Sequence, residues 1–499
     1  MPPRPRPVAV IDIGSNSGRV VVYSPEAGGA LRILASSRAS LRLVRELDET
    51  NALSRESVER AMDALRDFKA IVVGGGSRKV VAVATAAVRD ADNGRQFIQR
   101  VRRELGIRVQ VLSGEEEARF GFLGALRGLS VESGYLFDLG GGSLQLSRFR
   151  DRRLGENASF PLGALRLSDA FLHGDPPTHK ETKRLRAHAR SFFAASRFPR
   201  LARGEALVAT GGTVRNLAKV DQRLQGYPLH RLHGYELTRE RAEEVVALLA
   251  SRRLKKRVQV PGLNDDRGDS IVGGGLCVLT LMEWLDAPFL LVSGQGVREG
   301  LAVGIERASL PPGEAMRSAS VEALAQAFRG YDPRTSARRR ELARRLCDGL
   351  LPIPSEIRES LLHAATLLDV GRSIDFFDRH EHVADIVLST DLLGFSHRGI
   401  ALLSAVVRSA GDDGADLGAL APLVSHADVA SIERAATLLV LADDIEERCR
   451  DNRAIGLRVS LRPREARLSV SGLVGWRPRR IGSRFARAFG RALRVTAAA

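Results

Sequence analysis

The stretch VAVIDIGSNSGRVVVY at residues 8–23 decides the fold, because its pattern returns as GYLFDLGGGSLQLSRF at residues 134–149. The two copies align Asp12 with Asp138, and each is an apolar run, an acidic residue, a Gly/Ser-rich turn and a second apolar or alternating run. This order predicts two β-hairpins. Glycine permits positive φ, and successive N–H groups in such a turn form an anion nest. One copy could be an ordinary hairpin turn, but two matching copies at domain-scale spacing predict loops that face each other across an anion. The aspartates would then hold a cation beside it.

Strand-like and helical runs alternate around each copy. After the first copy, 80–85 is strand-like and 94–105 helical, then 108–114 is strand-like and 115–126 helical. After the second, 206–220 reads as a strand and a Gly-rich turn that opens a helix. The pattern predicts an α/β fold class with two domains of similar plan, a duplicated architecture. The domain limits that we assign are 1–130 and 131–308.

The rest of the chain has a different character. Residues 306–320 contain Pro, Gly and Ser and form the best linker candidate, 318–450 read as an all-α domain, and 451–499 as a small basic α+β region with a hairpin at 455–470. The last helix is expected to extend through residue 494 with an apolar face and a basic face. That basic face is either solvated or a patch for a long polyanion; the arginines assigned to it are Arg484, Arg487, Arg491 and Arg494.

Charge and composition narrow the class of protein. The 499 residues carry 76 Lys+Arg against 59 Asp+Glu, a net charge of +17, which favours polyanionic partners. Most of these cations are arginine, which a GC-rich coding sequence also explains, so the charge supports a phosphate-rich ligand without proving one. We expect no membrane span and no secretion signal, and three widely spaced cysteines indicate a cytoplasmic protein.

The three glutamates at 115–117 do not all have the same explanation. Ser113 and Glu116 have the spacing of a capping box, and Glu115 would lie in a first helical turn, where acids favour the macrodipole. Glu117 needs neither explanation, so it is the candidate for chemistry.

Eight segments, in this order along the chain, resemble the exopolyphosphatase/guanosine pentaphosphate phosphohydrolase family, a branch of the actin–Hsp70–sugar kinase superfamily. They are DIGSNSGR (12–19), TAAVRDADNG (85–94), SGEEEAR (113–119), DLGGGS (138–143), PLGALRL (161–167), ATGGT (209–213), RGDSIVGGG (267–275) and VSGQGVREG (292–300). One Gly-rich loop is weak evidence, whereas eight ordered segments are specific.

The resemblance implies two actin-like, ribonuclease H-like domains with the active site in the cleft between them, followed by an HD-like helical domain. It implies that Glu117 is the general base and that Arg89 is a phosphate-facing donor, although a surface ion pair would also explain Arg89. Mg²⁺ would be held by Asp12, Asp138 and Gln145. The implied phosphate-binding residues are Gly14, Ser15, Asn16, Ser17, Arg19, Gly140, Gly141, Gly142, Ser143, Gly211, Gly212 and Thr213.

Two positions depart from the family pattern. Gln145 stands where the family usually has an acidic residue, so metal affinity or turnover is expected to be reduced. In the HD-like domain Leu368 takes the place of the paired His before Asp369. His363, His380, His382 and Asp443 remain, but without that histidine we expect a degenerate metal site and an architectural domain that extends a polyanion path or forms a dimer contact.

Several functions compete at this level. The leading hypothesis is an exopolyphosphatase that releases orthophosphate from inorganic polyphosphate, working as a cytoplasmic homodimer without nucleic acid or membrane. Guanosine pentaphosphate 5′-phosphohydrolase activity needs the same site. A non-catalytic polyphosphate or alarmone sensor is a third possibility, and a sugar kinase fits less well, because a Glu base beside water-accessible phosphate loops suits hydrolysis.

Overall fold

The computed structural model describes residues 6–25, 31–44, 50–304, 310–350, 352–411, 417–449, 455–473 and 476–498. The chain divides into two compact units, Met1–Gly313 and Glu314–Ala499. Part of the predicted linker, and the domain limits predicted at 308 and at 450–451, lie outside the described residues. None of the described helices combines the length and the apolar character needed to cross a bilayer.

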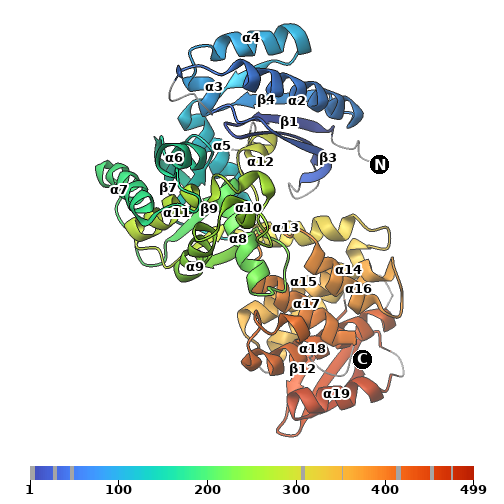
Figure 1. Ribbon diagram of the computed structural model, residues 1–499. Helices are drawn as coiled ribbons and strands as arrows, with labels where there is room; N and C mark the ends of the chain where they lie inside the picture. The colour runs from blue at the N-terminus through green and yellow to red at the C-terminus, as the bar shows by residue number, and fades with distance from the viewer. Residues whose placement is uncertain are drawn as a thin grey trace. The chain divides into compact units, whose positions relative to one another are not determined.

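The first sheet of unit 1 is built on the first copy of the repeat (Figure 1). Strands β1 (Val8–Ile13), β2 (Ser17–Pro25) and β3 (Leu31–Ser40) form an antiparallel meander, and β4 (Lys79–Ala84) and β5 (Val109–Val111) continue it in parallel, in the order β3-β2-β1-β4-β5. The β1 side chains are buried on both faces, apart from a half-buried Asp12 near its end. A central strand with helices on both faces has this apolar pattern.

The second sheet repeats the plan. Strands β6 (Gly134–Leu139), β7 (Leu144–Arg150) and β8 (Arg153–Phe160) form the meander, β9 (Ala206–Thr210) and β11 (Phe289–Val292) run parallel to β6, and β10 (Tyr235–Thr238) closes the edge. Both predicted hairpins are therefore confirmed. The registers also match, since Asp12 pairs with Arg19 in the first hairpin and Asp138 with Gln145 in the second.

Helices cover the outer face of each sheet. On the first sheet the core forms with α2 (Arg55–Gly74), α3 (Ala86–Asp90) and α4 (Gly94–Leu105). On the second it forms with α6 (Ala164–Phe171), α7 (His179–Ala195), α8 (Gly212–Leu224), α9 (Arg239–Ala250) and α11 (Ile271–Leu285). The boundaries predicted for the helix at 94–105 agree with α4, and the helix predicted at 115–126 is α5 (Gly114–Arg127).

Helix α5 lies on the inner side of both sheets beside α12 (Val297–Val303). The two helices touch backbone to backbone, because a Cβ atom on Gly124 would lie 1.8 Å from the Gly296 carbonyl oxygen and one on Gly300 would lie 1.9 Å from that of Phe120. This close packing fixes the first turn of α5, which carries Glu117.

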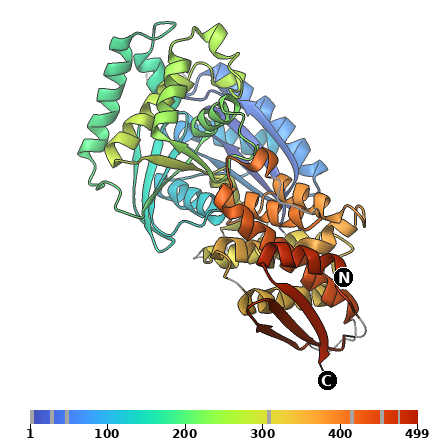
Figure 2. The ribbon, with the colours of Figure 1, turned by 90° about the horizontal axis from the view of Figure 1, so that it is seen from below.

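In the described residues of unit 2, a group of six α-helices precedes a small three-stranded sheet (Figure 2). The helices are α13 (Gly313–Gln326), α14 (Pro333–Gly349), α15 (Ser355–Arg372), α16 (Arg379–Ser389), α17 (His397–Gly411) and α18 (Val429–Arg448). The predicted hairpin is confirmed as β12 (Leu457–Leu461) with β13 (Glu465–Ser471), and β14 (Ala492–Ala498) joins β13 in parallel after α19 (Arg479–Phe489).

The prediction that the last helix extends through residue 494 with a basic face is wrong. The helix ends at Phe489, because Gly490 follows in the left-handed conformation (φ 63°) typical of a helix terminus. Arg491 and Arg494 therefore lie beyond it, and Arg494 belongs to strand β14. Arg484 is only 5% exposed, donates to backbone carbonyls of α17 and forms an ion pair with Glu433 at 3.1 Å.

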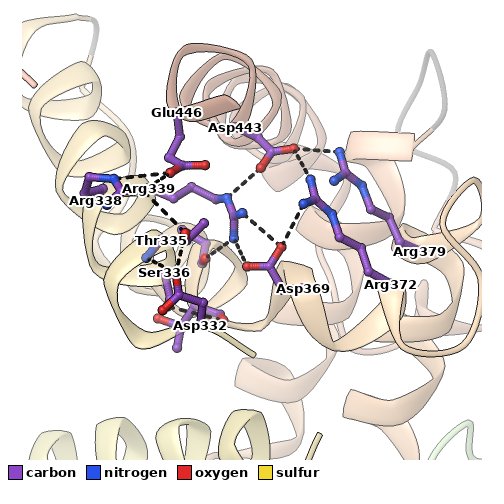
Figure 3. Close-up of polar contacts among 12 residues, drawn as sticks. Asp332, Thr335, Ser336, Arg338, Arg339, Asp369, Arg372, Arg379, Asp443 and Glu446 are labelled. Carbon is purple, nitrogen blue, oxygen red and sulfur yellow. Dashed lines mark hydrogen bonds and ion pairs between the residues drawn. The ribbon is translucent and has the colours of Figure 1, made fainter. Parts of the chain in front are cut away.

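A buried arginine, Arg339, lies in the core of unit 2 next to Asp369 (Figure 3). Asp369 follows Leu368, the position at which the family resemblance leads us to expect a histidine. Arg339 is fully buried, donates two bonds of 3.0 Å to Asp369 and one of 2.6 Å to Asp443, and so joins α14, α15 and α18. Arg372 and Arg379 complete the cluster around Asp443. A buried carboxylate pair needs a cation, and here a guanidinium provides it. The HD-like character expected for residues 318–450 stays a prediction.

Candidate active site

The two Gly-rich turns lie against each other within unit 1. Each is closed by the same hydrogen bond, from the Gly14 N–H to the Ser17 carbonyl oxygen (3.2 Å) and from the Gly140 N–H to the Ser143 carbonyl oxygen (2.9 Å). A Cβ atom on Gly141 would lie 3.0 Å from the Cβ of Asn16. The facing pair of loops expected from the repeat is therefore present.

A polar cavity of about 130 Å³ opens between these turns, at the carboxyl ends of β1 and β6. Ligands of α/β proteins commonly bind at this edge of the sheet. Most of the residues assigned from the sequence line the cavity, namely Asp12, Gly14, Ser15, Asn16, Ser17, Glu117, Asp138, Gly140, Gly141, Ser143, Gln145, Gly211 and Gly212. Arg19 lines an adjoining cavity instead. Arg89, Gly142 and Thr213 line neither, and Thr213 is buried.

Two carboxylates meet in this cavity, one from each sheet. Burial raises the pKa of both Asp12 and Asp138. The charge of Asp12 adds to the rise at Asp138 and that of Glu299 to the rise at Asp12, while Arg298 and Arg215 oppose both shifts. Arg298 lies 3.7 Å from Asp12. Paired acids that repel each other in a recessed cavity favour a bound cation or protons.

Glu117 lies at the same cavity on the first turn of α5. The predicted capping box is present, since Ser113 accepts from the Glu116 N–H (3.1 Å) and Glu116 accepts from the Ser113 N–H (2.9 Å). Glu117 takes no part in it and is 11% exposed. Burial, and then the charge of Asp138, raise the pKa of Glu117 to about 7. A carboxyl group with this pKa is suited to exchange protons at neutral pH.

Arg89 supports Glu117 from outside the cavity. Its guanidinium donates to a Glu117 carboxylate oxygen (3.4 Å) and to the Leu112 carbonyl oxygen (3.0 Å), and it also pairs with Asp90 at 3.3 Å. Arg89 is 27% exposed. The ion pair expected as the alternative is therefore present, and the phosphate-facing role of Arg89 stays a prediction.

Three further arginines line the cavity and were missed by sequence reasoning, namely Arg215, Arg267 and Arg298. Arg215 lies two residues after the ATGGT turn and contacts the Thr210 hydroxyl at 3.3 Å, and Arg298 lies two residues after Gly296. Burial, together with the charge of Arg298, lowers the pKa of Arg215 to about 10. The signal for Arg215 and Arg298 was an arginine within four residues of a Gly-rich turn.

Asn16 has an unusual environment for an amide. It is 5% exposed, and among the described residues neither its Nδ2 nor its Oδ1 atom has a hydrogen-bond partner. A buried polar group without a partner costs about 1–3 kcal/mol. An anion in the cavity would satisfy the amide nitrogen.

Gln145 holds its side chain within the second loop. Its Nε2 atom donates to the Ser143 hydroxyl at 2.7 Å, and the residue is buried at the cavity wall. The neutral side chain adds no third charge to Asp12 and Asp138.

A second cavity of about 230 Å³ adjoins the first and shares Ser17, Gly212, Arg215, Arg267 and Arg298 with it. We call it the arginine chamber. Its cations are Arg19, Arg38, Arg215, Lys219, Arg267 and Arg298, of which Arg38 and Arg267 are paired with Asp266 and Arg298 with Asp12. Burial, and then Arg298, lower the pKa of Arg19 to about 10. Cations packed this closely repel one another, so the chamber favours a polyanion.

The fold and the site define a class of duplicated α/β protein in which two Gly-rich loops and three carboxyl groups line one polar cavity. The model of the Ppx/GppA phosphatase family matches residues 21–308, and that of Ppx/GppA phosphatase domain III matches residues 316–471. The chain belongs to the Ppx/GppA phosphatase family, as the sequence resemblance indicated. It is a phosphatase with an actin-like fold followed by the family's domain III.

Relatives and solved structures agree with this assignment. Exopolyphosphatase 1 of Mycobacterium tuberculosis is 30% identical over 298 residues, covering 59% of this chain and 86% of that protein. The crystal structure of the Aquifex aeolicus family member is 29% identical with a TM-score of 0.52, covering 60% of this chain and 96% of that one. An exopolyphosphatase from Cytophaga hutchinsonii, 21% identical with a TM-score of 0.54 and with 60% and 96% coverage, supports the fold alone.

Proposed function

We propose that this phosphatase is an exopolyphosphatase, which hydrolyses the terminal phosphoanhydride bond of inorganic polyphosphate and releases orthophosphate. One observation carries the proposal: a recessed carboxyl group with a pKa of about 7, Glu117, faces a cavity made of two anion-binding loops. The printed name of the mycobacterial relatives points to the same reaction.

The chain's own residues suit each part of this hydrolysis. Glu117 orients a water molecule and takes its proton as the water oxygen attacks the terminal phosphorus. The P–O bond to the next phosphate breaks, and the electron pair leaves with the shortened chain. Loop N–H groups, the Asn16 amide and Arg215 act as fixed dipoles and charge around the transferred phosphoryl group. Arg89 orients the Glu117 carboxylate.

Asp12 and Asp138 suit a Mg²⁺ ion, both because they offer carboxylate oxygens and because two carboxylates are enough. Among the described residues no group of three or more His, Cys, Asp or Glu side chains could hold a metal ion alone. Mg²⁺ usually binds one or two carboxylates together with waters and substrate phosphates, and the cavity offers two carboxylates. Mg²⁺ would neutralise charge on the phosphoryl oxygens.

The arginine chamber favours polyphosphate over guanosine pentaphosphate as the substrate. Its walls are cationic and amide groups with one aliphatic side chain, Leu232, and the described residues place no aromatic ring there. A guanine base needs a flat apolar surface for stacking, whereas further phosphates need only cations. The remaining chain of polyphosphate would therefore occupy the chamber.

We further propose a cytoplasmic homodimer. All three cysteines are buried free thiols, as a reducing compartment would leave them. The homodimer rests on the family resemblance, and light scattering during size-exclusion chromatography tests it.

Phosphate release from long-chain polyphosphate, tripolyphosphate and guanosine pentaphosphate at equal Mg²⁺ concentration tests the function. We expect kcat/KM to be highest for the long chain. Lys219 lies exposed at the chamber, so Lys219→Gln should raise KM for the long chain. Lys255→Gln, which changes an exposed lysine outside both cavities, is the matched control. Preferred turnover of guanosine pentaphosphate would refute the substrate assignment, and absence of hydrolysis with every substrate would refute the activity.

A further inference from the structure

Unit 2 contains a larger cavity that the hydrolysis does not use. It has a volume of about 650 Å³, within the range of about 300–1,000 Å³ common for small-molecule sites. Its walls come from the start of α16, the end of α17, α18 and the chain from Trp476 to Arg484. All of these elements belong to one unit.

The cavity has a surplus of positive charge, because six arginines line it against three carboxylates, Asp378, Glu381 and Asp444. Three of the arginines are paired with carboxylates at 2.6–3.1 Å, namely Arg379, Arg448 and Arg484. The other three are Arg477, Arg479 and Arg480, whose side chains have no hydrogen-bond or ion-pair partner in the described parts of the chain.

These three arginines occupy the least favourable end of a helix. They precede or begin α19, whose first turn has no acidic residue and no side-chain cap. Cations at a helix N-terminus oppose the macrodipole. Folding gains nothing from this arrangement, but a phosphate group would be held by the free N–H groups and by the arginines together.

Aromatic side chains lie at the same cavity. Trp476 is half-buried with the Arg448 guanidinium 4.8 Å from its ring centroid, and Phe377 is 87% exposed. Exposure of a phenyl ring to water is unfavourable, and stacking on a planar ligand would remove part of that cost. Cations alone would suit any polyanion, whereas cations with aromatic rings suit a planar base that carries phosphates.

We propose that this cavity binds a purine nucleoside triphosphate, with the base on the aromatic side chains and the phosphates on Arg477, Arg479 and Arg480. The site is separate from the catalytic cavity, since its lining residues all belong to unit 2. Arg379, which lines the unit 2 cavity, also donates to Asp443 at 2.6 Å and so connects the cavity to the buried Arg339 cluster (Figure 3).

The chain offers a local reporter for the test. It has two tryptophans, so full-length Trp284→Phe protein emits only from Trp476. Titration with ATP, GTP, adenosine and tripolyphosphate should give a saturable change in emission with ATP or GTP, and at least tenfold weaker binding of adenosine and tripolyphosphate.

Substitution of the three free arginines by glutamine should weaken ATP binding by about tenfold or more, because a charge-assisted hydrogen bond is worth about that factor. Arg458→Gln, at an exposed position of β12 outside the cavity, should stay within about twofold of the parent. Calorimetry with Trp476→Ala gives a second measurement and should show the same loss. The proposal is overturned if ATP and GTP give no saturable change, if the triple variant binds ATP normally, or if tripolyphosphate binds as tightly as ATP.

Discussion

Replacing Glu117 by glutamine should abolish hydrolysis and at the same time stabilise the protein. The pKa of Glu117 is about 7 in the folded chain against 4.5 for an ordinary glutamate, so the fold favours the protonated carboxyl group. Each pKa unit corresponds to about 1.4 kcal/mol. Deprotonation therefore costs about 3 kcal/mol of folding free energy, a cost that begins near pH 4.5 and is complete above about pH 7. Glu117→Gln removes this cost and the base together.

Thermal unfolding in chelated, phosphate-free buffer measures the effect. Unfolding entropy is about 2.1 cal/mol/K per residue, so 3 kcal/mol in a unit that spans Met1–Gly313 corresponds to roughly 5 °C at pH 8. At pH 5 the gain should fall below about 1 kcal/mol, because Glu117 is then largely protonated in the folded state. Glu115→Gln is the control. It removes the same charge, but Glu115 is exposed, so the substitution replaces no buried carboxyl group.

The kinetic part uses the same proteins. Phosphate release by Glu117→Gln should fall by about 10²–10⁴-fold, while wild-type kcat/KM should rise with pH through an apparent pKa near 7. Equal stability of Glu117→Gln and wild type at pH 8, or the same difference at pH 5 and pH 8, would refute the reasoning about burial. Near-normal turnover would refute the role of Glu117 as base.

Three further outcomes are expected. Arg89→Ala removes a cation that lowers the pKa of Glu117, so the rise of kcat/KM should move to higher pH, and an unmoved pH profile would contradict this coupling. Gln145→Glu adds a carboxylate opposite Asp138 and should lower the Mg²⁺ concentration needed for half-maximal activity, which a Mg²⁺ titration checks. Arg339→Leu removes the fully buried cation between Asp369 and Asp443, which then keep only Arg372 and Arg379 among the described residues, and should cost about 3 kcal/mol; denaturant unfolding that shows a loss below 1 kcal/mol would argue against this account of the cluster.

The sequence predicted the parts of the fold that local chemistry decides. The two hairpins follow from an apolar run, an Asp and a Gly/Ser turn, and the capping box at Ser113 follows from spacing. The repeat also placed Asp12 and Asp138 together, whereas the expectation that Glu117 lies at the same site came from the family resemblance.

Features that depend on which elements meet in space were missed. Arg215 and Arg298 come from separate helices that converge only in the folded chain, and Arg339 lies in a helix that reads as amphipathic and polar. The error in the last helix had a local signal, because Gly490 marks its end, but the helical spacing of the arginines continued by coincidence into a strand.

The Arg339 cluster also limits how this core can change during evolution. Replacing Arg339, Asp369 or Asp443 alone leaves the buried charges of the cluster unbalanced, at a cost comparable to a large part of a domain's stability of about 5–15 kcal/mol. Replacing the cluster as a whole by apolar side chains of similar volume would avoid that cost. These three positions, distant in sequence on α14, α15 and α18, should therefore be inherited or exchanged as one set, with few viable lineages carrying a mixture.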